Sequence, residues 1–297
     1  MTRKTKYIIA IAALMVANLI LFSTGSDDDT VSSENYFNLK DIQGISRVMF
    51  MVDEDTTKIE RSEQGWTLND EFKADEGFMN TLISVLERVE VGRTIEEWDR
   101  EIMGTVEVEF DFNSRYKFQF ASNANKTKSY FITEGKAKEV AVPGYRDNVV
   151  DIFTLHPDQW RDRIIIDGSW RTIQRIQIVN RLDEDFEITF QNDFFMVNGQ
   201  PPVDSTAVIN YLNQFQQFQA NEMVSQGRFP ELDSLSQLEP FAELSIDDIK
   251  NDDLVILKIY SNQQRQPFHL VVDSDGQRMV VDARRIQQIL RNPDKLN

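Results

Sequence analysis

The chain repeats part of its own sequence, and an internal repeat restricts the choice of fold more than any other feature. The segment ISRVMFMV, which begins at Ile45, matches IQRIQIVN, which begins at Ile173, at a spacing of 128 residues. Residues 65–69 and 194–198 match at a spacing of 129 residues. The sequence therefore predicts two tandem repeats that share one order of helices and strands.

A helix is expected after these matched segments in each repeat. Its apolar side chains recur at the spacing i, i+3, i+7, i+10, which places them along one face of an amphipathic helix. The two sets correspond at the same spacing of 129 residues. They are Met79, Leu82, Leu86 and Val89 in the first repeat and Val208, Tyr211, Phe215 and Phe218 in the second.

Alternating apolar residues in the second half of each repeat predict strands with one buried face. They are Val106, Val108, Phe110 and Phe112, then Tyr116, Phe118 and Phe120, in the first repeat, and Val255, Leu257 and Ile259, then Phe268, Leu270 and Val272, in the second. A short strand and a brief helix close each repeat. We therefore predict an α+β fold in which each repeat reads β-β-β-α-β-β-β-α with mostly antiparallel sheets, over residues 42–167 and 168–297.

The longest stretch without a sustained period lies in the second repeat, at residues 225–248, and contains Pro230 and Pro240. Its counterpart in the first repeat is the shorter stretch 91–103. Loops of this length are uncommon and often functional. An insertion packed over the surface is the favoured interpretation, and a binding loop is the alternative.

The N-terminal residues 1–25 predict a membrane anchor. Three basic residues precede an apolar run from Tyr7 to Phe22, and polar, acidic residues follow it. The run approaches the length of a helix that spans the hydrocarbon core, and a cleaved signal peptide with the same pattern is the alternative. The positive-inside rule then predicts a single-pass protein of the inner membrane, with its body facing the periplasm or the exterior and residues 26–41 as a tether.

Composition excludes several kinds of chemistry. The chain has no Cys and two His, so thiolate zinc sites, iron–sulfur clusters and cysteine nucleophiles are excluded. Its formal charge of −17 argues against nucleic acid, whose binding depends on cations that contact phosphate. We predict no catalytic residue, no cofactor and no metal site, since no common nucleotide-binding or hydrolase motif is present.

Acidic segments sit between the predicted strands. Residues 53–55 and 183–185 occupy equivalent places in the repeats, and a polar hairpin turn is the favoured interpretation for both. Residues 273–276 (DSDG) match the start of a calcium loop, but the closing Glu is missing, so a hairpin turn is favoured there too.

Trp66 aligns with Phe195, which indicates core packing. Trp160 and Trp170 flank the repeat boundary and are predicted to lie at the seam between the repeats, where aromatic side chains bury much area. For His156 a structural hydrogen bond is favoured over a role as a base. His269 is expected at the surface, because it alternates with apolar residues.

The order of these features resembles the bacterial domain-of-unknown-function family numbered 4340. The resemblance is carried by the N-terminal segment, the Trp-led strand at residues 65–68, the Ala74-Asp75 helix start and the stretch PDQWRDR at residues 157–163. A Gly-Leu-x-x-Pro turn of that family is matched here only in part. Such proteins look like extracytoplasmic companions of ABC-type transport systems, so the resemblance implies partners in the membrane and no catalytic residue.

The sequence thus predicts an accessory or scaffold subunit of an envelope complex that is not an enzyme. The alternative is a module that binds an envelope polysaccharide or peptide in a cleft between the repeats. A hydrolase that uses two carboxylates is the third hypothesis. The N-terminal helix would contact the membrane, integral membrane proteins are the expected partners, and no small-molecule ligand is identified.

Overall fold

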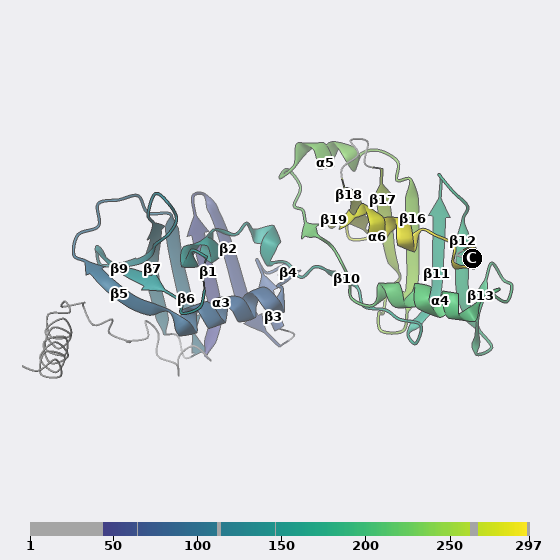
Figure 1. Ribbon diagram of the computed structural model, residues 1–297, viewed down its shortest axis with the longest axis horizontal. Helices are drawn as coiled ribbons and strands as arrows, with labels where there is room; N and C mark the ends of the chain where they lie inside the picture. The colour runs from purple at the N-terminus through teal and green to yellow at the C-terminus, as the bar shows by residue number, and fades with distance from the viewer. Residues whose placement is uncertain (1–43, 64, 112–113, 146, 262–266, 296–297) are drawn as a thin grey trace, which may run out of the picture. The chain divides into compact units, whose positions relative to one another are not determined.

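Figure 1 shows the computed structural model of the chain, which describes residues 44–63, 65–111, 114–145, 147–261 and 267–295. The predicted anchor 1–25, with Tyr7 and Phe22, and the predicted tether 26–41 lie outside the described residues. Among the helices within the described ranges, none has the length and apolar character of a membrane span.

The described chain forms two compact units. Unit 1 consists of the residues up to Glu71 together with Glu76–Leu155, and unit 2 consists of Phe72–Asp75 together with the residues from His156 onward. The division after Leu155 precedes the predicted repeat boundary at residue 167. A short piece of chain within the first half of the sequence therefore belongs to unit 2.

Unit 1 is built on one antiparallel sheet. Its strands are β1 (Ile45–Val52), β2 (Asp55–Ser62), β3 (Gly65–Leu68), β5 (Glu90–Ile95), β6 (Gly104–Phe110), β7 (Arg115–Ser122), β8 (Ser129–Thr133) and β9 (Lys136–Ala141). The sheet has nine strands in the order β4-β3-β2-β1-β6-β7-β8-β9-β5, with the two-residue strand β4 (Phe72–Lys73) at its edge. Helix α3 (Glu76–Arg88) and the 3₁₀ helix η2 (Val149–Thr154) complete the unit.

Unit 2 has a sheet of eight strands that repeats the order from β3 to β5. Its strands are β11 (Ile173–Asn180), β12 (Phe186–Gln191), β13 (Phe194–Val197), β15 (Glu222–Met223), β16 (Ala242–Asp248), β17 (Val255–Tyr260), β18 (Phe268–Asp273) and β19 (Arg278–Asp282). They run β13-β12-β11-β16-β17-β18-β19-β15 across the sheet. In each sheet the first long strand, β1 or β11, has a hairpin on one side (β2–β3 or β12–β13). On its other side is a meander of four strands (β6–β9 or β16–β19).

The remaining elements of unit 2 are short. They are β4 (Phe72–Lys73), η3 (Pro157–Trp160), β10 (Ile164–Ile166), α4 (Ser205–Leu212), η4 (Asn213–Phe215), β14 (Phe218–Gln219), α5 (Pro230–Leu235), α6 (Ala283–Ile289) and η5 (Pro293–Lys295). β10 pairs with β14 in a separate two-stranded sheet. Figure 1 shows α4 and α6 lying against the large sheet.

The predicted fold class is wrong. The described chain is mainly β-sheet rather than α+β, because most of its regular residues belong to strands and its helices are few and short. The predicted order β-β-β-α-β-β-β-α is also wrong, since each large sheet takes five strands from the chain that follows α3 or α4.

The strands that the sequence pattern missed also change how the units correspond. β16 lies beside β11 as β6 lies beside β1, so the strand at Val106 corresponds to β16 and not to the strand at Val255. The stretch 225–248, expected to be an irregular insertion, contains α5 and the central strand β16. β5 likewise covers the first five residues of the stretch 91–103 that was expected to be irregular.

The core of unit 1 is aromatic. The ring of Phe153 from η2 lies 5.7 Å from Phe50 of β1, 5.3 Å from Phe120 of β7 and 5.9 Å from Phe131 of β8. All four side chains are at most 2% exposed. The predicted helix stripe Met79, Leu82, Leu86 and Val89 is buried as expected, although Val89 follows the last residue of α3.

The core of unit 2 joins α4 and α6 to one face of the sheet. Tyr211 of α4 is 1% exposed, and its hydroxyl donates to the carbonyl oxygen of Ile289 at 2.5 Å. Burial raises the pKa of Tyr211 well above its ordinary value, because the phenolate would lose its hydration. The hydroxyl therefore stays protonated and ties the two helices together.

Gly104 is packed too tightly to accept a side chain, and Gly104→Ala is expected to lower the free energy of unfolding by about 1 to 3 kcal/mol. A Cβ there would lie 2.6 Å from the carbonyl oxygen of Met51 and 2.8 Å from the ring of Phe120. Gly92→Ala is the control, since its Cβ would meet its nearest atom, the carbonyl oxygen of Glu139, at 3.6 Å. Urea unfolding of both variants measures the difference, and equal stabilities would contradict this packing.

Candidate functional site

An aromatic hollow of about 450 Å³ lies in unit 2, where the β12–β13 hairpin turns next to the start of α4. Four aromatic side chains line it: Trp170, Phe190, Phe194 and Phe195. The rest of the lining comes from Gln191, Asn192, Asp193, Met196, Pro201, Pro202, Ser205 and Ile209. We call this site the aromatic hollow.

The rings of the aromatic hollow are open to solvent. Phe194 is 72% exposed, and Trp170 and Phe190 are each 39% exposed. Large apolar side chains that gather at one exposed place mark a binding surface more often than scattered ones do. The fourth ring, Phe195, is half-buried and packs against the core, with its centre 5.1 Å from that of Phe190.

The hairpin turn sets the position of these rings. Asn192 and Asp193 both have positive φ, 50° and 69°, which is the backbone of a tight two-residue turn that suits the twist of its strands. Gln191 then pairs with Phe194, and Phe190 pairs with Phe195. Successive side chains of a strand point to opposite faces, so Phe190 and Phe195 share the core-facing side while Phe194 lies at the rim.

α4 forms the second wall of the aromatic hollow. Asp204 caps the helix, with its Oδ1 accepting from the amide of Thr206 at 2.8 Å. The preceding chain is held by the amide of Val203, which donates to Asp294 Oδ1 at 3.3 Å. Pro201 and Pro202 restrict the backbone that leads into the helix, so this wall is preformed.

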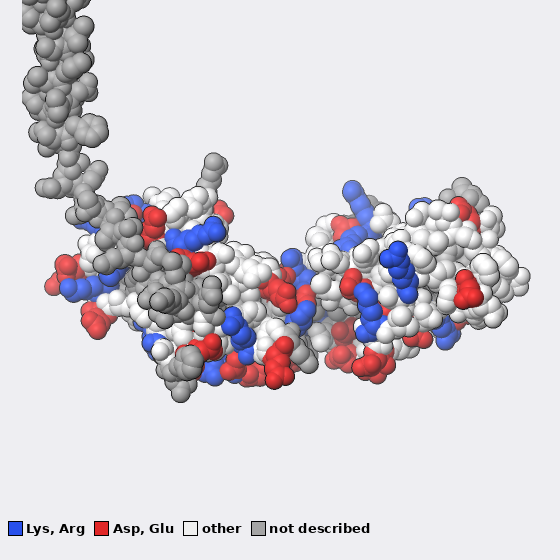
Figure 2. Space-filling view, turned by 90° about the horizontal axis from the view of Figure 1, so that it is seen from below, with Lys and Arg blue, Asp and Glu red and all other residues white. Residues whose placement is uncertain are grey.

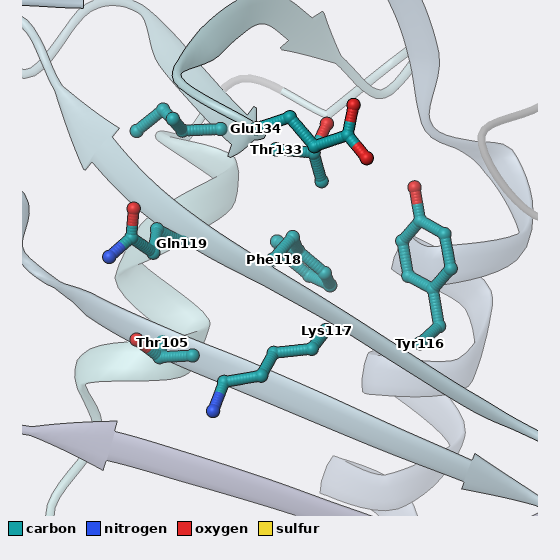
Figure 3. A pocket seen from close by; sticks show the side chains of 8 residues that line it. Thr105, Tyr116, Lys117, Phe118, Gln119, Thr133 and Glu134 are labelled. Carbon is teal, nitrogen blue, oxygen red and sulfur yellow. The ribbon is translucent and has the colours of Figure 1, made fainter.

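A second hollow, of about 680 Å³, lies in unit 1 on β6, β7 and β8 (Figure 3). It is lined by Thr105, Tyr116, Lys117, Phe118, Gln119, Ile132, Thr133 and Glu134. Figure 3 shows the amine of Lys117 pointing away from the carboxylate of Glu134. Because its polar groups do not converge, this hollow is the weaker candidate.

The two units differ in surface charge on the face that Figure 2 shows. The sheet of unit 1 carries cross-strand ion pairs, such as Arg47 with Glu60 and with Glu109, both at 2.8 Å. Figure 2 shows acidic and basic side chains mixed over the visible face of unit 1, whereas the part of unit 2 where Figure 1 places β12, β13 and α4 is mostly uncharged. Unit 2 is therefore the unit that offers an apolar contact surface.

The structure separates the two tryptophans that were predicted to form a seam. Trp160 is fully buried inside unit 2, in η3, whereas Trp170 is exposed and lines the aromatic hollow. The guanidinium of Arg171 lies 5.2 Å from the centre of the Trp170 ring. Trp66 is 9% exposed and packs in the core of unit 1 as predicted.

The histidines have structural contacts. His156 caps η3, and its Nδ1 accepts from the amide of Asp158 at 3.1 Å, which confirms the predicted structural hydrogen bond. His269 is half-buried rather than at the surface, because its ring packs 5.4 Å from that of Phe241. Neither histidine lines a hollow described above.

The three acidic segments form turns, as predicted. Asp53 follows β1 with a φ of 51°, and residues 183–185 connect β11 to β12. In the β18–β19 turn, Asp273 Oδ1 accepts from the amides of Asp275 and Gln277 at 3.0 and 2.8 Å. Burial raises the pKa of Asp273 in spite of these two bonds. In the described part of the chain, no group of three or more possible ligands is placed to hold a metal ion.

Asp158 is the most deeply buried carboxylate of unit 2 that carries ion pairs, at 1% exposure. It accepts from the amide and hydroxyl of Ser225 at 2.9 and 2.5 Å and from Arg228 at 3.2 Å. Arg161 lies 3.5 Å away and stacks on Phe72. Both oxygens are thus occupied, so the cluster joins η3 to the chain that leads into α5 and leaves no room for a substrate.

No protein-family model, curated protein or solved structure matches the chain. The resemblance to the domain-of-unknown-function family numbered 4340 therefore stays a prediction. Sequence reasoning found one of the four rings of the aromatic hollow as a candidate, Trp170, and placed it elsewhere. The missed signal was the cluster of three Phe around an Asn-Asp turn at residues 190–195.

The Asp158 cluster is expected to stabilise unit 2 in a pH-dependent way. Burial alone raises the pKa of Asp158, but the bonds from Ser225 and the charges of His156 and Arg161 outweigh it and lower the pKa. The stability that this carboxylate adds is present above its unfolded pKa, near 3.8, and is lost as the pH falls through its lower folded value.

Asp158→Asn should therefore lower the free energy of unfolding at pH 7 by about 3 to 5 kcal/mol, because it removes the buried anion that Arg228 and Arg161 face at 3.2 and 3.5 Å. It should also flatten the dependence of stability on pH below about 4. Glu239→Gln removes an exposed charge, 81% accessible, from the same unit and should change neither quantity. Urea unfolding from pH 7 to pH 3 tests both, and a variant as stable as the parent would contradict the role of the cluster.

Proposed function

We propose that the protein is a binding protein, an accessory subunit that holds a partner protein in the aromatic hollow of unit 2. The observation that carries this proposal is the exposure of Phe194, Phe190 and Trp170 around one hollow beside a sheet edge. Aromatic side chains that are rigidly held and half-exposed are typical anchors of protein interfaces. The partner would cover their apolar surface on binding.

The position of the aromatic hollow supports a protein partner. β13 is the last strand of the large sheet of unit 2, so its outer edge is open to another chain. The backbone groups of Val197 on that edge are already bonded to Gln200, at 2.8 and 2.9 Å, which ends the open edge two residues after Phe195. A partner would therefore meet the rings first and the strand edge only over a short distance.

The location outside the cytoplasm and the link to a transport complex are parts of the same proposal. They rest on the basic and apolar residues at the N-terminus and on the acidic charge of the chain. An accessory subunit in such a complex needs a fixed contact surface and no catalytic group. The closed Asp158 cluster and the absence of converging polar groups in the hollow of unit 1 support that role.

Phe194→Ser is expected to reduce capture of the partner at least fivefold, because it removes the most exposed anchor ring. The measurement is a pull-down of the tagged full chain from detergent-solubilised native membranes, with recovered proteins quantified by mass spectrometry. Leu182→Ser is the matched control, since Leu182 is 75% exposed in the same unit and does not line the aromatic hollow. Equal recovery by both variants would contradict the proposal.

A saccharide is the second candidate occupant. It is favoured by the amide side chains of Gln191 and Asn192, which line the aromatic hollow together with its rings. Sugars stack on aromatic faces and bond to amides, so an envelope oligosaccharide should change the fluorescence of Trp170 on titration. The variant Trp170→Phe should abolish that change, and an unchanged signal at saturating sugar would exclude this occupant.

A further inference from the structure

Unit 1 carries a cation at the place where unit 2 carries the aromatic hollow. In unit 1, Arg61 pairs with Trp66 one position before the last pair of the β2–β3 hairpin. The guanidinium carbon of Arg61 lies 4.9 Å from the centre of the Trp66 ring. In unit 2, Phe190 and Phe195 form the pair at the same position of the β12–β13 hairpin.

The two hairpins thus differ at this pair, where unit 1 has an arginine opposite the aromatic ring and unit 2 has a phenylalanine. Both place an aromatic ring on the second strand of the hairpin, β3 or β13, but only unit 1 covers it with a guanidinium from the neighbouring strand. A cation within about 6 Å of a ring centre is attracted by the negative face of the ring. In unit 2, Phe190 stands at the position of Arg61. The pair Phe190–Phe195 therefore has two rings and no cation of its own.

The charge around the aromatic hollow favours a cationic occupant. Asp193 lines the hollow at the hairpin turn, and Asp204 lies at the start of α4, next to the lining residue Ser205. The guanidinium of Arg171 lies over Trp170, which shows that a guanidinium fits against this ring. The formal charge of −17 adds a long-range attraction for a basic partner.

We infer that the aromatic hollow binds an arginine side chain of the partner, stacked on Phe190 and Phe195 as Arg61 is stacked on Trp66 in unit 1. This inference rests on the proposed function and names the chemistry of the occupant. Arginine fits better than lysine, because its planar guanidinium is weakly hydrated and stacks on rings. Asp193 at the rim would pair with its charge.

The test compares two peptides with the full chain purified in detergent. The probes are an acetylated, amidated Gly-Arg-Gly peptide and its citrulline counterpart, which has nearly the same shape without the charge. Saturable binding of the arginine peptide, with binding of the citrulline peptide roughly tenfold weaker, is expected from calorimetry or from Trp170 fluorescence. Equal affinities, or no binding of the arginine peptide at millimolar concentration, would overturn the inference.

Phe190→Arg is the decisive variant, because it recreates in unit 2 the arginine that unit 1 has. The new side chain should fill the aromatic hollow and lower the affinity for the arginine peptide at least tenfold. Leu182→Arg adds the same charge elsewhere on unit 2 and should leave the affinity unchanged. If Phe190→Arg does not fold, as judged by its thermal unfolding, Asp193→Asn takes its place and should weaken binding about threefold.

These results separate the inference from the proposed function. If Phe194→Ser loses the partner while the two peptides bind equally, the aromatic hollow holds a partner but not through arginine, and the inference alone fails. If Phe194→Ser keeps the partner, the proposed function fails, and the comparison of the two peptides still shows whether the aromatic hollow prefers a guanidinium.

Discussion

Each unit depends on the burial of one face of a central antiparallel strand pair, β1 with β6 and β11 with β16. Val48 lies opposite Val108 in the first pair and Ile176 opposite Ile246 in the second, and all four are fully buried. Apolar contact across such pairs is the main unit of sheet stability. The hairpin on one side and the meander on the other extend from this pair. The central pair of unit 2 therefore sets the position of the β12–β13 hairpin and of the aromatic hollow beside it.

Sequence patterns were reliable where burial followed a regular period. The stripe of α3, the strands at Val106 and Val255 and the hairpin turns were predicted because alternation or a 3.6-residue period marks the buried face. The second helix stripe was right only in part, since Val208 and Tyr211 lie in α4 but Phe215 lies in η4 and Phe218 in β14. β8 was missed because Ser129 to Ile132 are all buried and show no alternation. β16 was missed because Pro240 precedes it and two acids end it, even though Ala242, Leu244 and Ile246 alternate. The error in fold class followed from these missed strands.

The aromatic hollow was hard to predict for a different reason. Phe194 and Phe195 are adjacent in sequence, and the alignment of Phe195 with Trp66 indicated core packing at that position without distinguishing Phe194 from it. Both lie in β13, however, and a strand places neighbouring side chains on opposite faces, so Phe195 is half-buried while Phe194 is exposed. The exposure of a residue at the tip of a hairpin depends on which other elements pack against that tip. Here α4 lies on one side of it. This packing cannot be predicted from composition.

The path of the chain has a practical consequence. Phe72–Asp75 belongs to unit 2, where Ala74 bridges to Arg161 and the amide of Asp75 donates to the carbonyl oxygen of Trp160 at 2.7 Å. No single cut in the sequence separates the two units, because each half would keep residues whose partners are in the other. A fragment that ends at Leu155 would expose Phe72 and Ala74 without the residues that cover them. Fragments expressed separately would thus be prone to aggregate, even though each contains most of a hydrophobic core.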